Sequence, residues 1–261
     1  MRRCPFHRVE PSPWPILAAS GLGVTALSFI FFLHGDSFVA VGMGLGQMIL
    51  AFWGWFRDII VEATFLGKHT KRVQRGLLLG FMFFLTSELM FFITFFWGFV
   101  YSCMAPGIAL GFSFPPEIGV MKYTGVPMIN SALLLGTVLP VRAAMKSVRA
   151  CDLKGGVWKL VISIIMGVLF VFLQGYEFYT CPFTIADGVY GCCFFALTGL
   201  HGSHVVGGLV FLIIGAGRLY YGHFSSNRHL GLTFSVWYWH FVDAIWVVVY
   251  LLIYLWVSLG C

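Results

Sequence analysis

One acidic residue lies almost at the centre of a long apolar segment, where a carboxyl group could hold or pass a proton. The segment covers residues 77–100, and Glu88 is its only charged side chain. At about 1.5 Å per residue, a helix of this length is about 36 Å long and can cross a bilayer. A carboxylate at mid-membrane costs about 2.5 kcal/mol or more, so such a residue is usually functional and has a partner.

Two histidines in another apolar segment, residues 189–215, are the candidate partners of Glu88. His201 and His204 are three positions apart and lie on neighbouring faces of one helix, near mid-membrane. Small residues that let a second helix approach closely recur in this segment, at Gly199, Ser203 and Gly207. We expect a carboxylate–imidazole pair between the two helices, with His204 as the better candidate. The alternative is a protonated Glu88 bonded to a backbone carbonyl, with no further role.

The eight histidines of the chain raise the question of a haem or copper site. Those in apolar segments are His201, His204 and His240, while the others fall in loops or at segment ends. A bis-histidine haem needs imidazoles facing each other from two helices, and a copper site needs clustered ligands. The seven cysteines contain no C-x-x-C spacing. The pattern therefore argues against a redox centre or a metal site, and we assign no catalytic residue.

The composition is that of a polytopic membrane protein. Of 261 residues, 59% are hydrophobic and 10% charged, whereas a soluble domain has about 25% charged residues. We expect an all-α protein with seven membrane-spanning helices and a Pro-rich loop at residues 105–127. The predicted spans are residues 14–33, 38–55, 77–100, 128–141, 157–176, 189–215 and 237–257.

The distribution of basic residues tests this count of spans. With seven spans, every Lys and Arg outside them except Lys122 falls on the side of the N-terminus. Cytoplasmic and matrix loops are enriched in Lys and Arg. The bias therefore places the N-terminus on the matrix or cytoplasmic side and the C-terminus on the opposite side.

Two further groups combine polar and aromatic residues. The segment WYWHFVD, from Trp237 to Asp243, opens the last predicted span, where its aromatic residues would form an interfacial belt and His240 could pair with Asp243. A plain interface anchor and a functional role both remain open. Basic and polar residues at the N-terminal side suit phosphate recognition by a lipid site, or a loop that only fixes topology. They are Glu62, Lys68, His69, Arg72, Arg218, His223 and Arg228.

Several segments together resemble subunit III of the haem–copper cytochrome c oxidases, in the order typical of that family. They cover nearly the whole chain and are SPWP (12–15), WFRDIIVEATFLGKHT (55–70), SELMFF (87–92), FPPEIG (114–119), VPMINSALLL (126–135), PFTIADGVYG (182–191), TGLHGSHV (198–205) and WYWHFVD (237–243). The resemblance implies a subunit of the respiratory enzyme that oxidises cytochrome c, reduces O2 to water and pumps protons. Subunit III itself binds no haem or copper. Haem a, haem a3 and copper belong to partner subunits.

The resemblance also implies an arrangement and a set of site residues. Residues 1–72 would form an N-terminal arm, helices I–II and an inner-side loop, and residues 73–261 a five-helix bundle, with phospholipids in a V-shaped cleft between them. Glu88 matches the intramembrane carboxyl of the family, and His201 and His204 match its HGxH pair. The implied lipid contacts are Trp55, Glu62, His69, Arg218, His223 and Ser225.

The chain departs from the family pattern at a few positions. Lys68 and Arg228 replace the first histidine of two His–His pairs, and Thr233 replaces a glutamate. Individual lipid contacts, and one polar neighbour of Glu88, can therefore differ from those of relatives.

We therefore expect a non-redox core subunit of cytochrome c oxidase that supports assembly, lipid binding, proton uptake and O2 access. Its partners would be subunits I and II, further subunits of the complex and membrane phospholipids, and we expect no nucleic acid. The expected location is the mitochondrial inner membrane, with the bacterial plasma membrane as the alternative. The competing function is that of a polytopic transporter with its substrate site at Glu88.

Overall fold

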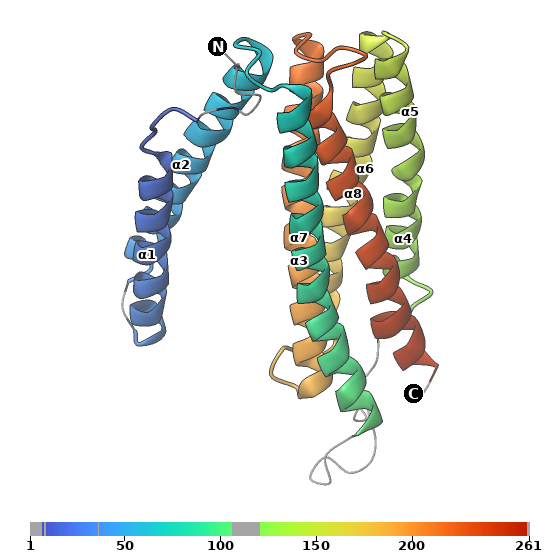
Figure 1. The fold of residues 1–261 in the computed structure, drawn as a ribbon. Coiled ribbons are helices and arrows are strands. Elements are labelled where there is room, and N and C mark those ends of the chain that lie inside the picture. Colours follow the sequence, from blue (N-terminus) through green and yellow to red (C-terminus); the bar gives the residue numbers. More distant parts are fainter. Residues whose placement is uncertain (1–6, 8, 36, 106–120, 260–261) are drawn as a thin grey trace. The chain divides into compact units, whose positions relative to one another are not determined.

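The chain is described by a computed structural model that covers residues 7, 9–35, 37–105 and 121–259 (Figure 1). Within these ranges the structure is helical, and no β-strand occurs beyond an isolated bridge between Ser225 and Arg228. The FPPEIG motif lies outside the described residues. The helices are α1 (Trp14–Leu33), α2 (Val39–Thr64), α3 (Lys71–Met104), α4 (Val126–Gly136), α5 (Val138–Arg149), α6 (Leu153–Thr180), α7 (Val189–Tyr220), α8 (Leu230–Val249) and the π-helix η2 (Tyr250–Trp256).

The predicted all-α fold with seven membrane-spanning helices is confirmed. Among the described residues, seven helical segments are long and apolar enough to cross a membrane. Helices α4 and α5 together form one of them, Val126–Arg149, and α8 with η2 forms the last, Leu230–Trp256. A helix bonds most of its backbone polar groups internally, which lipid requires because it offers no partner.

Several predicted spans are too short, because apolar composition indicates only the part of a helix that lies in hydrocarbon. Helix α2 continues past Trp55 to Thr64. The last span begins at Leu230 and not at Trp237. Its first turns carry small polar residues, but Ser235 donates to the carbonyl oxygen of Phe211 at 3.1 Å. The polar residues that lower the hydropathy of this part of the helix therefore have hydrogen-bond partners inside the protein.

The fourth span is also longer than the predicted residues 128–141, and it is interrupted. Helix α4 ends at Gly136 and α5 begins at Val138. Pro140 explains the break, because its ring would clash with the carbonyl of Gly136 and it has no N–H to donate there. Pro140 is instead the third residue of α5, where a missing N–H costs little. Thr137 joins the two helices.

The chain forms two compact units, residues 1–79 and 80–261. In the first unit, α1 packs against α2 through glycines. A Cβ atom at Gly44 would lie 2.5 Å from Thr25 Oγ1, and one at Gly21 would lie 3.0 Å from Met48 Cγ. The absent side chains thus permit close contact between the two helices. The predicted boundary after residue 72 stays a prediction, and α3 runs through it without a break.

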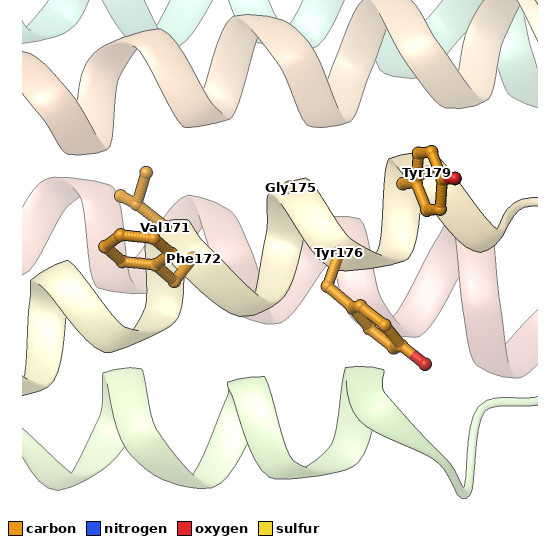
Figure 2. A pocket seen from close by; sticks show the side chains of 5 residues that line it. All are labelled: Val171, Phe172, Gly175, Tyr176 and Tyr179. Atoms are coloured by element: carbon orange, nitrogen blue, oxygen red, sulfur yellow. The ribbon is translucent and has the colours of Figure 1, made fainter.

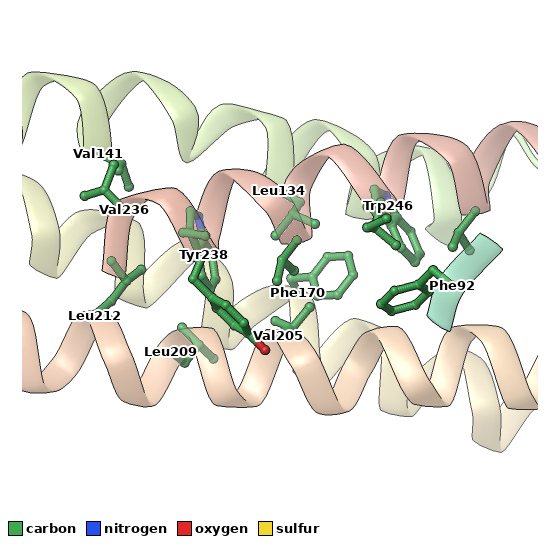
Figure 3. Packing of buried hydrophobic residues seen from close by; sticks show 14 of the residues in the cluster. Phe92, Leu134, Val141, Phe170, Val205, Leu209, Leu212, Val236, Tyr238 and Trp246 are labelled. Carbon is green, nitrogen blue, oxygen red and sulfur yellow. The ribbon is translucent and has the colours of Figure 1, made fainter. Parts of the chain in front are cut away.

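The core of the second unit lies among α3 to α8 and η2 (Figure 3). Two buried tryptophans of α8 reach across to the interrupted span. Trp239 Nε1 donates to Thr137 Oγ1 at 2.7 Å, and Trp246 Nε1 donates to Ser131 Oγ at 3.0 Å. The predicted position of the WYWHFVD motif at the start of a span is therefore wrong. Trp239 is a core residue at the middle of α8, whereas Trp237 is 37% exposed.

Thr137→Val should destabilise the second unit by about 1–3 kcal/mol, because it leaves the buried Trp239 N–H without an acceptor while keeping the side-chain shape. Chemical unfolding in detergent, followed by tryptophan fluorescence, measures the change. Thr94→Val is the control, since Thr94 is exposed and bonds only the carbonyl of Met90 in its own helix. Equal effects of the two substitutions would contradict the prediction.

Candidate functional site

Glu88 of α3 and His204 of α7 are in direct contact. Glu88 Oε2 lies 2.9 Å from His204 Nε2, with side-chain exposures of 25% and 12%. The other ring nitrogen of His204, Nδ1, is 2.9 Å from the carbonyl oxygen of Leu200. A carbonyl can only accept, so Nδ1 carries a proton. A hydrogen bond between Nε2 and the carboxyl group needs one further proton, which either of the two groups can hold.

Aromatic rings surround this pair. Phe92, one turn from Glu88 on α3, packs edge-on against the His204 ring with centroids 5.0 Å apart. Tyr238 of α8 stacks against His204 at 6.4 Å and against Phe84 at 6.2 Å. The rings replace water on most sides of the pair. In such surroundings the attraction between the carboxyl and imidazole groups is stronger than in water.

His201, the other candidate partner of Glu88, lies inside the second unit and is fully buried. Its ring packs against Trp246 at 5.0 Å and against Phe170 at 5.9 Å. Neither ring nitrogen has a hydrogen-bond partner among the described residues. The two histidines therefore point to different surroundings, and His204 alone is paired with Glu88.

His240 and Asp243 lie together on α8, as the i, i+3 spacing predicted. His240 Nδ1 is 3.6 Å from Asp243 Oδ2, an ion-pair distance that is too long for a hydrogen bond. Asp243 is only 3% exposed. This pair is well inside its helix, not at the interface end where the motif was expected.

In the first unit, the predicted lipid-contact residues face the N-terminal arm. His7 Nε2 is 3.0 Å from Glu62 Oε2, and the His7 and His69 rings are 6.1 Å apart. Lys68 Nζ donates to Glu10 Oε1 at 2.6 Å. The same arm borders a cavity of 230 Å³ whose lining includes Trp55 and Glu62. The structure thus brings three of the predicted residues, Trp55, Glu62 and His69, to one part of the first unit.

In the second unit, the other three predicted lipid contacts come from the end of α7 and the loop after it. The Arg218 guanidinium lies 4.4 Å above the Phe224 ring. A Cβ atom at Gly231 would be 2.6 Å from Arg218 Nη1, so only glycine leaves room for the guanidinium there. The backbone N–H of His223 donates to the carbonyl of Arg218 at 2.9 Å, and Ser225 forms the bridge with Arg228.

Sequence reasoning missed a group of buried polar residues in the second unit. Glu177 was expected in a loop after residue 176, but it lies in α6 and is fully buried. The sequence holds a signal, because Phe170, Gln174 and Glu177 fall on one helix face at the i, i+4, i+7 spacing. The other members of the group are Asn130 and Tyr254.

The described residues contain no group of three or more His, Cys, Asp or Glu side chains that could hold a metal ion.

A comparison with protein families matches residues 4–258 to cytochrome c oxidase subunit III. The chain belongs to this family. Proteins named cytochrome c oxidase subunit 3 are similar over almost their whole length. The Gadus morhua protein is 43% identical over 256 residues, covering 97% of each chain, and that of Struthio camelus is 42% identical over 254 residues, again 97% of each. In Marchantia polymorpha the subunit is 40% identical over 257 residues, covering 97% of this chain and 96% of the other.

A double-mutant cycle should show that Glu88 and His204 interact directly. We expect a coupling energy of about 0.5–2 kcal/mol between Glu88→Gln and His204→Gln, since the two groups share one proton in apolar surroundings. Unfolding free energies of the four variants in detergent give this value. Ser87→Ala combined with His204→Gln is the control, because Ser87 is exposed and bonds Phe84. Coupling no larger than in the control would exclude the direct interaction.

His69 should make the stability of the first unit depend on pH. Burial, and secondly the neighbouring His7, lower the pKa of His69 below its usual 6.5. When folding lowers the pKa of a histidine, the folded state binds protons less readily than the unfolded state. The histidine therefore costs no stability above about pH 6.5, where it is neutral in both states, and it destabilises the fold as the pH falls below that value. The melting temperature of wild type relative to His69→Gln should therefore fall between about pH 7.5 and 5.5. His34→Gln, at an exposed position of the same unit, is the control, and a difference that does not change with pH would refute this role.

Proposed function

We propose that this chain is a non-redox core subunit of cytochrome c oxidase that supports proton uptake, O2 access, lipid binding and assembly in the complex. The observation that carries the proposal is the Glu88–His204 pair inside the apolar helices of a chain that belongs to the subunit III family. Family membership makes the chain a subunit of an oxidoreductase complex.

The pair at Glu88 suits a role in holding a proton. Its carboxyl and imidazole groups share one proton, and neighbouring aromatic rings keep most water away. While the pair holds this proton it has no net charge in the membrane interior, whichever group carries the proton. This favours support of proton traffic over a purely structural hydrogen bond to a backbone carbonyl, because the partner of Glu88 is an imidazole.

The transporter alternative is not supported. The comparisons find oxidase subunits along nearly the whole chain. Transporter sites tend to lie where helices are interrupted and several polar groups meet the substrate. Helix α3 is continuous through Glu88, whose carboxyl group is engaged by His204.

Subunits I and II, with haem a, haem a3 and copper, are the proposed partners. The redox chemistry would then belong entirely to those subunits. A broad apolar surface is available for helix–helix or lipid contact. On α6, for example, Phe172 is 74% and Tyr179 is 89% exposed, beside an apolar hollow of 440 Å³ (Figure 2).

Phospholipids are the proposed ligands of two regions, one in each unit. In the first unit, Trp55, Glu62 and Lys68 line a cavity that has both polar and apolar walls, and His69 follows Lys68 in the chain. In the second unit, Arg218 is fixed by Phe224 and Gly231, with His223 and Ser225 following in the loop. A fixed guanidinium suits a phosphate group, which it can bind through two hydrogen bonds.

The chain is an integral membrane protein, and we place it in the mitochondrial inner membrane with its N-terminus on the matrix side. Support comes from the one-sided distribution of Lys and Arg and from relatives that belong to animals and a plant. The bacterial plasma membrane is the alternative location.

Purification of the tagged full chain in mild detergent tests the proposal. We expect haem-containing subunits to co-purify and to give the absorption bands of haem a. A colourless chain that elutes alone from membranes with active oxidase would refute it. A Soret band that stays with the chain after its partners are removed would refute the non-redox assignment.

Glu88→Gln should leave O2 reduction by the assembled complex within about tenfold of wild type, which corresponds to less than about 1.4 kcal/mol in the activation barrier. The reason is that this substitution touches no redox centre. Oxygen consumption with reduced cytochrome c is the measurement, and Ser87→Ala is the control. Abolition of O2 reduction in fully assembled Glu88→Gln complex would contradict the non-catalytic assignment.

A further inference from the structure

A group of buried polar side chains lies inside the second unit, near the end of α6 and the beginning of α4. The group consists of Asn130 (α4), Gln174 and Glu177 (α6) and Tyr254 (η2), each 5% exposed or less. Glu177 precedes the end of α6 by three residues, and Asn130 follows the start of α4 by four. These residues therefore come together at one end of the helix bundle.

Most polar atoms of this group have no hydrogen-bond partner among the described residues. Asn130 Nδ2 approaches Gln174 Oε1 at 3.5 Å, the limit for such a bond. The Tyr254 hydroxyl lies close enough to Glu177 and Gln174 to interact with both, although no contact among the described residues meets the full distance and angle requirements of a hydrogen bond. The atoms without partners are Asn130 Oδ1, Gln174 Nε2, both carboxyl oxygens of Glu177 and the Tyr254 hydroxyl.

His201 extends this pattern deeper into the same unit. Both of its ring nitrogens are buried and without partners in the described part of the chain. The His201 ring packs on Trp246, and the Trp246 ring contacts that of Tyr254 with centroids 6.1 Å apart. Figure 3 shows Trp246 and Phe170. The face of α6 that carries Glu177 and the face of α7 that carries His201 are therefore both turned to the interior of the second unit.

The chemistry of these atoms identifies the ligand class. Glu177 and Asn130 offer acceptors, Gln174 Nε2 and one nitrogen of His201 are donors, and the Tyr254 hydroxyl is both. A metal cation would be repelled by the donors, and an anion by the carboxyl group. Water donates and accepts, and buried water typically bonds about three polar groups that otherwise have no partner.

We propose that ordered water molecules occupy this interior and form a hydrogen-bonded network from Glu177 and Tyr254 towards His201. The network would satisfy polar groups that the protein alone leaves unbonded, as buried polar groups almost always are satisfied. It gives the chain a second internal carboxyl site, separate from the Glu88–His204 pair. The wide turn of η2 is consistent with such a site, because π-helical turns often occur at functional positions.

A surface groove lies beside this interior. It has a volume of 250 Å³ and runs between α6 and α7. Gln174 lines this groove and is also a member of the buried group, so its amide separates the outside from the interior. No heavy atom lies within 4 Å of the Cβ positions of Gly175, Gly199 and Gly202, which also line the groove, so their lack of side chains keeps it open.

Hydroxyl-radical footprinting of the purified full chain, in whatever complex it is extracted, tests the proposal. Radicals generated by an X-ray pulse modify side chains beside bound water even when these are closed to bulk solvent. With isotope-labelled water, we expect label on Tyr254 and His201 several-fold above that on Trp239 and Phe99. Those two controls are equally buried, and the Trp239 N–H is already bonded to Thr137. Equal labelling of all four residues would overturn the proposal.

Gln174→Leu tests the same network by substitution. Loss of the amide should lower the labelling of Tyr254 several-fold, whereas Gln47→Leu, at an exposed glutamine bonded to Ser20, should not change it. Unchanged labelling in a folded Gln174→Leu chain would overturn the proposal. If that variant does not fold, the wild-type comparison decides. The readout does not depend on oxidase activity, so it separates this inference from the proposed function.

Discussion

Polar groups within membrane-spanning helices must find their partners inside the protein, because lipid offers none. This constraint explains the Glu88–His204 contact, which unites a carboxyl group of α3 with an imidazole of α7. It also explains the two tryptophans of α8, whose N–H groups reach the hydroxyls of Thr137 and Ser131 on the interrupted span. In both cases one hydrogen bond ties together helices that are far apart in sequence.

The two histidines of α7 show how the same constraint produces different roles. His204 faces α3 and shares a proton with Glu88, whereas His201 faces the interior beside Trp246. The pair is thus one part of the site and the buried group around Glu177 is another. Together they give a subunit without its own redox chemistry two places where protons or water could be held. Its role in the oxidase is then one of support.

Family resemblance and geometry contribute different parts of the functional argument. The match over residues 4–258 establishes the oxidase family, which geometry alone would not do, because a seven-helix membrane protein can serve many functions. The geometry shows what the family name does not, namely which imidazole pairs with Glu88 and that Glu62 is paired with His7. Lipid contacts at Glu62 and His69 would therefore have to accommodate the N-terminal arm.

The sequence by itself determined the number of membrane spans, because the hydropathy of seven segments and the one-sided distribution of Lys and Arg both indicate it. It also supplied Glu88 and both candidate histidines. The tertiary structure decided which histidine is the partner, since His201 and His204 differ only in the direction they face. It also moved Trp239 from an expected interface into the core and Glu177 from an expected loop into a buried helix face. Hydropathy cannot show this, because a polar residue inside a membrane helix lowers the hydropathy in the same way as the polar end of a helix. Only the groups around the residue in the fold show that it is buried. Glu88 was evident because apolar residues surround it in sequence, whereas the surroundings of Glu177 come from α4, α7 and η2.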